Sequence, residues 1–195
     1  MEDLETIQRC RDRDKAAFEA LYQAYALKAL RTAFLMTHQS NMAEDAVQET
    51  FVQVWTSIDK LRDVHAFRAW FFRILINRVK YLGKRDKGNH TLPLETAVDH
   101  RDDHTPRPED QAERDEELRR VQTAIARLPE PQRVPVILRY FSELSEEEIA
   151  ATLGIPAGTV KSRLHTARAR LQEQLSDHHA SFSLTGLKAN PENRK

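Results

Sequence analysis

The sequence is poor in the residues that form disulfides, cysteine metal sites and membrane spans. Cys10 is the only cysteine among 195 residues, so one chain can form neither an internal disulfide nor a metal site built from cysteines. We expect it to be a small buried apolar side chain rather than a redox-sensitive thiol. No run approaches the eighteen apolar residues of a membrane span, and the acidic start MEDLE is unlike a signal peptide. These absences predict a cytoplasmic protein.

Glycines and metal ligands are also scarce. Only five glycines, with 40% hydrophobic and 31% charged residues, favour a soluble and helix-rich chain. The eight histidines are scattered, and none has a second ligand at a spacing typical of a metal site. The sequence therefore predicts no catalytic residue, no metal, no cofactor and no small-molecule substrate.

Net charge is absent, but local charge is not. Thirty Lys and Arg balance thirty Asp and Glu, and a neutral total by itself predicts no partner. Residues 66–88 hold seven Lys or Arg and one acid, a local charge of +6, whereas residues 89–117 hold ten acids and three Arg, a local charge of −7. Basic patches flank an acidic middle, which the total hides.

Hydrophobic periodicity predicts an all-α fold. A weak helix should span residues 4–11. Asp14 should cap one long helix, or two abutting helices, continuing to about Thr37, where the polar HQSN ends the pattern. A third helix is expected from about residue 41 to Ile58, then a loop over residues 59–65 and a fourth helix over residues 66–85. Together they form one helical domain, residues 1–88.

Residues 89–112 lose this pattern, since they combine three prolines with clustered acids, and we interpret them as an acidic flexible linker. A helix should resume at about Arg114, with one apolar side formed by Leu118, Val121, Ile125 and Leu128. A second helical domain, residues 113–175, would follow the linker. Residues 176–195 have no period and are expected to be a disordered tail.

Residues 145–175 have the pattern of a helix-turn-helix. Ser145 and Glu148 have capping-box spacing, Gly154 suits a left-handed helix end, and Pro156 suits the first turn of the next helix. That helix buries one stripe and carries four Lys or Arg and no acid over residues 157–172, so it is the one expected to enter a DNA major groove. The buried stripe of this second helix is formed by Val160, Leu164, Ala167 and Leu171. The alternative interpretation is an ordinary pair of packed helices whose basic face is exposed to solvent.

The helix over residues 66–85 interleaves aromatic and basic side chains. Its spacing makes Phe67, Trp70 and Phe71 core residues. The part of this helix outside its buried stripe suits the binding of melted or single-stranded nucleic acid. Its cations can bind phosphates, and its aromatic rings and amides can contact bases. The candidates on it are Asn77, Arg78, Lys80 and Tyr81.

Three stretches together resemble the bacterial sigma factors of the extracytoplasmic-function (ECF) group in the sigma-70 family. They are AEDAVQETFVQVW at residues 43–55, AFRAWFFRILINRVKYLGKR at 66–85, and the segment 128–171, which ends in GTVKSRLHTARARL. The resemblance implies that Asp45, Gln48 and Glu49 dock on the β′ coiled coil of core RNA polymerase. It also implies that the domain 1–88 opens and recognises the −10 promoter element, with residues 60–65 as the specificity loop. Its DNA-binding residues would be Asn77, Arg78, Lys80, Tyr81, Lys84 and Arg85.

The same resemblance implies that the domain 113–175 recognises the −35 element. Lys161, Ser162 and His165 fall on base-reading positions, and Arg163 and Arg168 fall on phosphate-binding ones. The acidic linker matches the segment that threads toward the active centre and RNA exit channel of polymerase, whose β′ and β subunits are the expected partners, and its charge would there mimic RNA. Most family members are held inactive by an anti-sigma factor, often one anchored in the membrane, so the resemblance implies such a partner here. The chain lacks the middle domain and the paired-tryptophan wedge of housekeeping sigma factors.

Two other functions stay open at this point. One is a stand-alone helix-turn-helix regulator, which would bind duplex DNA as a dimer, although no dimerisation segment is evident and the first domain would be unexplained. The other is a DNA-acting enzyme such as a nuclease, which needs clustered carboxylates or histidines to hold a metal. The acids here fall in the linker or at helix caps.

Overall fold

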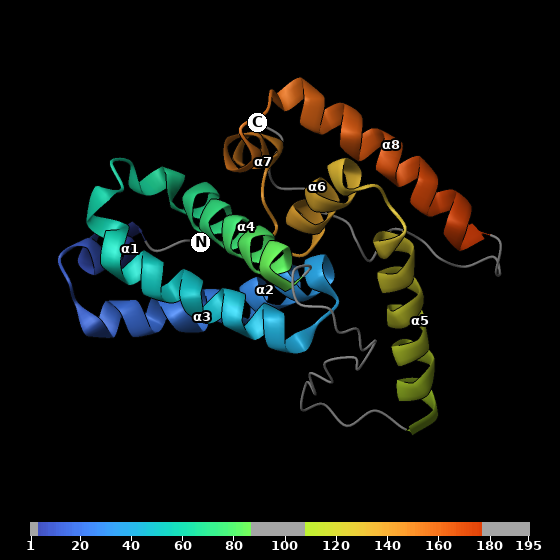
Figure 1. The fold of residues 1–195 in the computed structure, drawn as a ribbon, viewed down its shortest axis with the longest axis horizontal. Coiled ribbons are helices and arrows are strands. Elements are labelled where there is room, and N and C mark those ends of the chain that lie inside the picture. Colours follow the sequence, from blue (N-terminus) through green and yellow to red (C-terminus); the bar gives the residue numbers. More distant parts are fainter. Residues whose placement is uncertain (1–3, 87–107, 177–195) are drawn as a thin grey trace.

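The computed structural model describes residues 4–86 and 108–176, and every regular element in these two ranges is helical (Figure 1). The predicted all-α fold is confirmed. Most of the predicted linker and the predicted tail lie outside the described residues. In chain order the elements are α1 (Leu4–Arg11), α2 (Lys15–Thr37), α3 (Ser40–Ser57), η1 (Ile58–Lys60), η2 (Val64–Ala66), α4 (Phe67–Asp86), α5 (Pro108–Ala126), α6 (Glu130–Tyr140), α7 (Glu146–Leu153) and α8 (Ala157–Ser176).

Helix α2 begins at the cap that the sequence predicted. The Asp14 carboxylate accepts hydrogen bonds from the backbone N–H groups of Ala16 and Ala17, at 2.8 and 3.2 Å, which satisfies donors that a helix start leaves unpaired. The Arg9 guanidinium donates to the same carboxylate at 2.7 Å. These bonds, that from Arg9 first, hold the pKa of Asp14 below its usual range. At the other end, His38 takes the left-handed conformation, with φ of 56°, and ends the helix.

An aromatic cluster holds α2, α3 and α4 together. The ring of Tyr25 lies 4.9 Å from Phe71 and 5.3 Å from Phe67, both on α4. Phe51 on α3 lies 5.4 Å from Phe71. Edge and tilted contacts at these spacings add to the burial of large apolar rings, so Phe67 and Phe71 are core residues as predicted.

The helix-turn-helix geometry follows the sequence closely. Ser145 Oγ accepts from the Glu148 N–H at 3.1 Å while the Glu148 carboxylate accepts from the Ser145 N–H at 2.6 Å, a complete capping box. Gly154 adopts φ of 67° and ends α7, a conformation that costs glycine little. The carbonyl of Pro156 accepts from Thr159 N–H and Val160 N–H at 2.9 and 3.2 Å, so Pro156 stands just before the first turn of α8. The predicted stripe of α8 is buried in full.

Two expectations for α5 are wrong. The helix begins at Pro108 rather than near Arg114, because proline has a helical φ and lacks only an N–H that the first turn leaves unpaired anyway. Leu118 was expected on the buried side but is 52% exposed. Among residues 116–126 of this helix the buried ones are Ala124 and Ile125, near its C-terminal end. Figure 1 shows the N-terminal end of α5 projecting away from the other helices.

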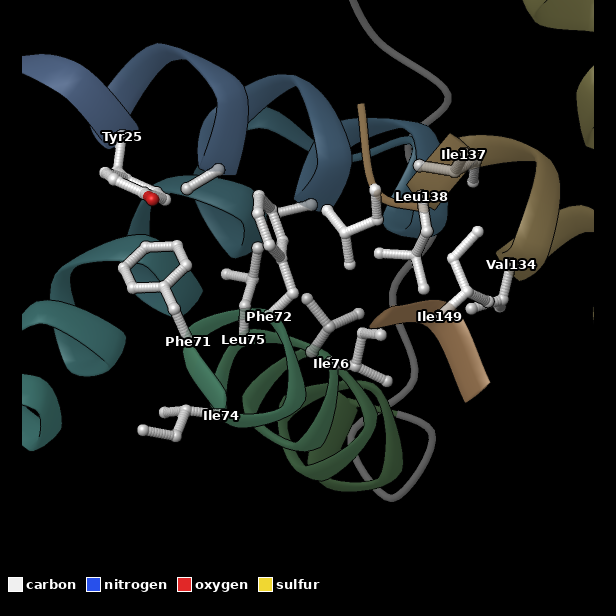
Figure 2. Packing of buried hydrophobic residues seen from close by; sticks show 14 of the residues in the cluster. Tyr25, Phe71, Phe72, Ile74, Leu75, Ile76, Val134, Ile137, Leu138 and Ile149 are labelled. Atoms are coloured by element: carbon white, nitrogen blue, oxygen red, sulfur yellow. The ribbon is translucent and has the colours of Figure 1, made fainter. Parts of the chain in front are cut away.

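Helix α4 buries a second side that periodicity did not predict. Ala69, Phe72 and Ile76 are 6%, 0% and 4% exposed. At 100° per residue they lie about half a turn away from Phe67 and Phe71. Figure 2 shows Phe72 and Ile76 beside Leu138 of α6 and Ile149 of α7. The two helical units therefore share one continuous apolar core.

We expect Ser145→Ala to lower the free energy of unfolding by about 1 kcal/mol, the usual cost of losing an N-cap oxygen. Ser145→Thr is the matched control, since it keeps a hydroxyl at the cap. Urea unfolding followed by far-UV circular dichroism measures both, and equal midpoints for the alanine and threonine variants would contradict the role of the capping box.

Candidate nucleic-acid interface

The outer face of α8 presents the predicted base-reading side chains to solvent. Lys161, Ser162 and His165 are all exposed, and the buried stripe holds the opposite side of the helix against the unit. Because α8 is long, free on this face and fixed on the other, it has the form of a helix that enters a major groove. Across residues 4–86 and 108–176, these three side chains form no hydrogen bond or ion pair that would turn them away from a ligand.

The two arginines predicted to hold phosphates differ in position. Arg168 is exposed, and its Nε donates to the Tyr140 hydroxyl of α6 at 2.8 Å. This bond fixes the direction of the guanidinium at the edge of the face that carries Lys161 and His165. Arg163 is half-buried and lies on another side of α8, because it follows Ser162 by 100°. The structure therefore places Arg168, but not Arg163, beside Lys161 and His165.

The exposed strip of α4 gathers most of the predicted −10 residues. Asn77, Lys80, Tyr81 and Lys84 recur at intervals of three and four and are exposed, so they share one side of the helix. The Arg85 guanidinium lies 6.0 Å from the Tyr81 ring centroid, an arrangement of cation and aromatic ring that suits unstacked bases and phosphates. Lys80 also pairs with Glu130 of α6 at 3.2 Å.

Arg78 stands apart from this strip. Its guanidinium donates two hydrogen bonds to Gln53 Oε1 of α3, at 2.9 and 3.1 Å, and lies 3.5 Å from the Glu49 carboxylate. The structure thus joins a residue predicted to bind DNA to one predicted to bind polymerase. In this arrangement Arg78 ties α4 to α3.

An apolar groove between α2 and α3 was not predicted. Phe18 and Tyr22 of α2 line it together with Phe51, Val52 and Trp55 of α3. Val52 is 60% exposed and Tyr22 is 45% exposed, which is unusual for large apolar side chains this close together. Gln48 lines the groove and Asp45 is exposed on the same helix, whereas Glu49 is half-buried beside Arg78. The sequence held one signal for this groove: Val52 is a large apolar residue that lies off the buried stripe of α3.

Other site types find little support in the parts of the chain that the structure describes. Across residues 4–86 and 108–176, no three His, Cys, Asp or Glu side chains gather as a metal site requires. No helix in those same ranges is both long and apolar enough to cross a membrane. Cys10 is buried, as predicted.

Two family models match this chain. Residues 21–87 match sigma-70 region 2, and residues 118–171 match sigma-70, region 4. Among curated relatives, the RNA polymerase sigma-H factor of Pseudomonas aeruginosa is 33% identical over 181 residues, which cover 89% of this chain and 94% of the relative. The ECF RNA polymerase sigma factor SigW of Bacillus subtilis is 30% identical over 178 residues, with 88% and 95% covered.

Two solved structures have a similar fold. One is CnrH in complex with the cytosolic domain of CnrY, at a TM-score of 0.68 and 26% identity, covering 91% of this chain and 99% of the other. The second is the sigma factor RpoE of Bartonella quintana in complex with the anti-sigma factor NepR, at a TM-score of 0.61 and 28% identity, covering 83% and 99%.

We expect Cys10 to react slowly with thiol reagents in the folded chain. Burial, with a smaller contribution from Asp14, raises the pKa of its thiol from 9.0 to about 11, which lowers the thiolate fraction near neutral pH about 100-fold. Alkylation by iodoacetamide at pH 8 should therefore be at least about 100-fold slower for the native chain than for the urea-unfolded chain, as followed by mass spectrometry. Equal rates would contradict the burial of this thiol.

Proposed function

The chain belongs to the sigma-70 family of RNA polymerase sigma factors, in its extracytoplasmic-function group, and we propose how its two helical units divide the work of directing transcription. The first domain, residues 1–88, docks on core RNA polymerase and recognises the −10 element. The second, residues 113–175, recognises the −35 element. The exposed face of α8, in a helix-turn-helix whose first helix has a complete capping box, is the observation that carries this proposal. The protein itself is a non-enzymatic initiation factor, and polymerase performs the chemistry.

Polymerase docking is assigned to α3 and the groove beside it. Gln48 lines the groove with the apolar side chains of Tyr22 and Val52, and Asp45 is exposed on the same helix as Gln48. A helix of the β′ subunit laid into this groove would bury those side chains, while polar residues at the rim fix its register. Glu49 also takes part in polymerase docking, from its position beside Arg78.

Recognition of the −10 element is assigned to the exposed strip of α4. Lys80, Lys84 and Arg85 supply positive charge for phosphates, and Asn77 offers both a donor and an acceptor to the edge of an unpaired base. Tyr81 offers an aromatic face for stacking. When DNA binds, Arg78 gives up its contacts with Gln53 and Glu49 of α3 and binds a phosphate instead.

Recognition of the −35 element is assigned to α8. Lys161, Ser162 and His165 meet base edges in the major groove, and Arg168 and Arg163 meet phosphates on either side. We also propose control by an anti-sigma factor, since one of the similar solved structures is a sigma factor, RpoE, in complex with the anti-sigma factor NepR. Such a partner, if membrane-anchored, would hold this cytoplasmic protein at the inner face of the membrane.

A stand-alone regulator and a DNA-acting enzyme are separated from a sigma factor by one experiment. Core RNA polymerase is incubated with a genomic DNA library, with and without this protein, and run-off transcripts are sequenced. A sigma factor produces new, discrete transcript starts only when it is present. A regulator or a nuclease produces none.

Substitution in the groove should weaken polymerase binding without affecting the fold. We expect Val52→Asp to raise the dissociation constant for core polymerase by about tenfold or more, because a buried charge replaces an apolar contact near the centre of the interface. Gln23→Asp is the matched control, since it places the same residue on the exposed surface of α2, outside the groove. Fluorescence anisotropy measures both, and equal constants would argue against docking in the groove.

Base-reading and phosphate-binding residues of α8 should differ in their effects on selectivity. We expect His165→Ala to relax base preference at one −35 position by about tenfold, and Arg168→Ala to weaken binding about equally across sequences. Promoter selection from a randomised −35 library by the reconstituted holoenzyme measures this. Thermal melting controls for loss of the bond between Arg168 and Tyr140, and an unchanged preference in the His165 variant would remove it from the reading set.

A further inference from the structure

The turn between α1 and α2 holds Arg13 in a strained backbone conformation. Its φ of 65° lies in the left-handed region, which costs free energy for a residue with a side chain and little for glycine. The Arg13 N–H donates to the Cys10 carbonyl at 3.1 Å, and the Asp14 N–H donates to the Arg9 carbonyl at 3.1 Å. A glycine would form the same backbone bonds without this cost. A contribution from the side chain of Arg13 is therefore expected.

The Arg13 side chain reaches the C-terminal end of α3. Its Nη1 donates to the Trp55 carbonyl, and its Nη2 donates to the Asp59 carboxylate at 3.2 Å. The guanidinium carbon also lies 5.6 Å from the centroid of the Trp55 ring, which is within the range of a cation–π contact. Trp55 lies in the last turn of α3, where carbonyls lack partners within the helix and favour a cation. One side chain thus joins the α1–α2 turn, the end of α3 and the start of the loop that follows it.

The two residues that Arg13 contacts belong to different proposed surfaces. Trp55 lines the groove assigned to polymerase docking, and its ring centroid lies 4.8 Å from that of Phe18. Asp59 lies in η1 and directly precedes residues 60–65, the loop predicted to give specificity for the −10 element. Arg13 is neither a lining residue of the groove nor part of this loop. It therefore contacts both surfaces from outside them.

The loop after Asp59 is short, anchored by its backbone and exposed at its polar side chains. Leu61 is 5% exposed, and its N–H donates to the Ile58 carbonyl at 3.1 Å. The Asp63 carboxylate accepts from the His65 N–H at 2.9 Å and caps η2. Because the segment is so short, the direction in which its backbone leaves α3 decides where its polar side chains point. The exposed polar side chains of the loop are Lys60, Arg62, Asp63 and His65.

The contacts of Arg13 determine orientation more than stability. The side chains of Arg13 and Asp59 are 44% and 50% exposed, and ion pairs with such exposure contribute little net free energy to folding. The contacts with Trp55 use the same guanidinium, whose planar fork restricts the relative positions of the groups that it joins. Removing the side chain should therefore change the orientation of the loop more than the free energy of unfolding.

We propose that Arg13 is a positioning residue for −10 recognition, whose contacts with Trp55 and Asp59 set the direction of residues 60–65 relative to the polymerase groove. This inference rests on the proposed function. A loop held in one direction loses less conformational freedom when it meets a base. It also cannot shift to accept a wrong base, whereas a loop that is free to move can. Loss of the Arg13 side chain therefore lowers the discrimination between bases.

Arg13→Gly tests the proposal, because glycine adopts this left-handed φ freely and only the side chain is lost. Holoenzyme reconstituted from the full chain and core polymerase selects promoters from a library that is randomised over the −10 element. We expect base preference at one −10 position to fall about fivefold, while the dissociation constant for core polymerase changes by less than about twofold. An unchanged preference would overturn the inference, as would a fall spread evenly over every position.

A double-mutant cycle ties the effect to the contact with the loop. Asp59→Asn removes the charge that Arg13 contacts and should lower preference at the same −10 position. The double variant should lower it no further than Arg13→Gly alone. Arg11→Ala is the matched control, since it removes an arginine from the end of α1 whose guanidinium donates to Gln8 of that helix at 3.0 Å. Additive losses, or an equal loss in the Arg11 variant, would contradict the positioning role.

Failure of the proposed function would give a different result. If wild-type holoenzyme selects no −10 sequence, the proposed function fails and this inference fails with it. If the wild type selects a sequence and Arg13→Gly selects it equally well, only this inference fails. Hydrogen exchange in the free chain adds a measurement that needs no polymerase. The Leu61 N–H should exchange about tenfold faster in Arg13→Gly than in the wild type, and equal rates would count against a loop held by Arg13.

Discussion

The burial of apolar side chains on two sides of α4 is the constraint on which the rest of the structure depends. Phe67 and Phe71 pack against α2 and α3, while Phe72 and Ile76 pack against α6 and α7. Removing either partner would expose a large apolar patch to water. Only one strip of the helix remains free, and it carries the polar and basic side chains. The helix at the centre of the core is therefore also the helix proposed to recognise the −10 element.

Ion pairs connect the helices that apolar packing brings together. Arg78 links α4 to Glu49 on α3, and Arg68 links α4 to the start of α7. Partly exposed ion pairs contribute little net stability and are weakened by salt, so they determine orientation more than strength. Phosphates can replace the carboxylates in such pairs, and the same arginines and lysines can then serve either the packed chain or a nucleic acid.

Local features of the fold could be predicted because their causes lie within a few residues. The Asp14 cap, the Ser145 capping box and the left-handed Gly154 all follow from short-range hydrogen bonds and backbone sterics. The buried stripe of α8 follows from the helical repeat of its apolar residues. The exposure of Leu118 could not be predicted, since it depends on where α5 meets the other helices. The start of α5 at Pro108 has a local cause that hydrophobic periodicity does not record.

By itself, the sequence determined where most of the helices lie, which side of most of them is apolar, and which family motifs the chain contains; α5 is the exception on both counts. Tertiary structure decided that Phe72 and Ile76 are buried, that Tyr22 and Val52 border a groove, and that Arg78 contacts Glu49. The physical reason is that each of these depends on residues distant in sequence. A periodic pattern records which side chains avoid water, but it does not record which other helix covers them.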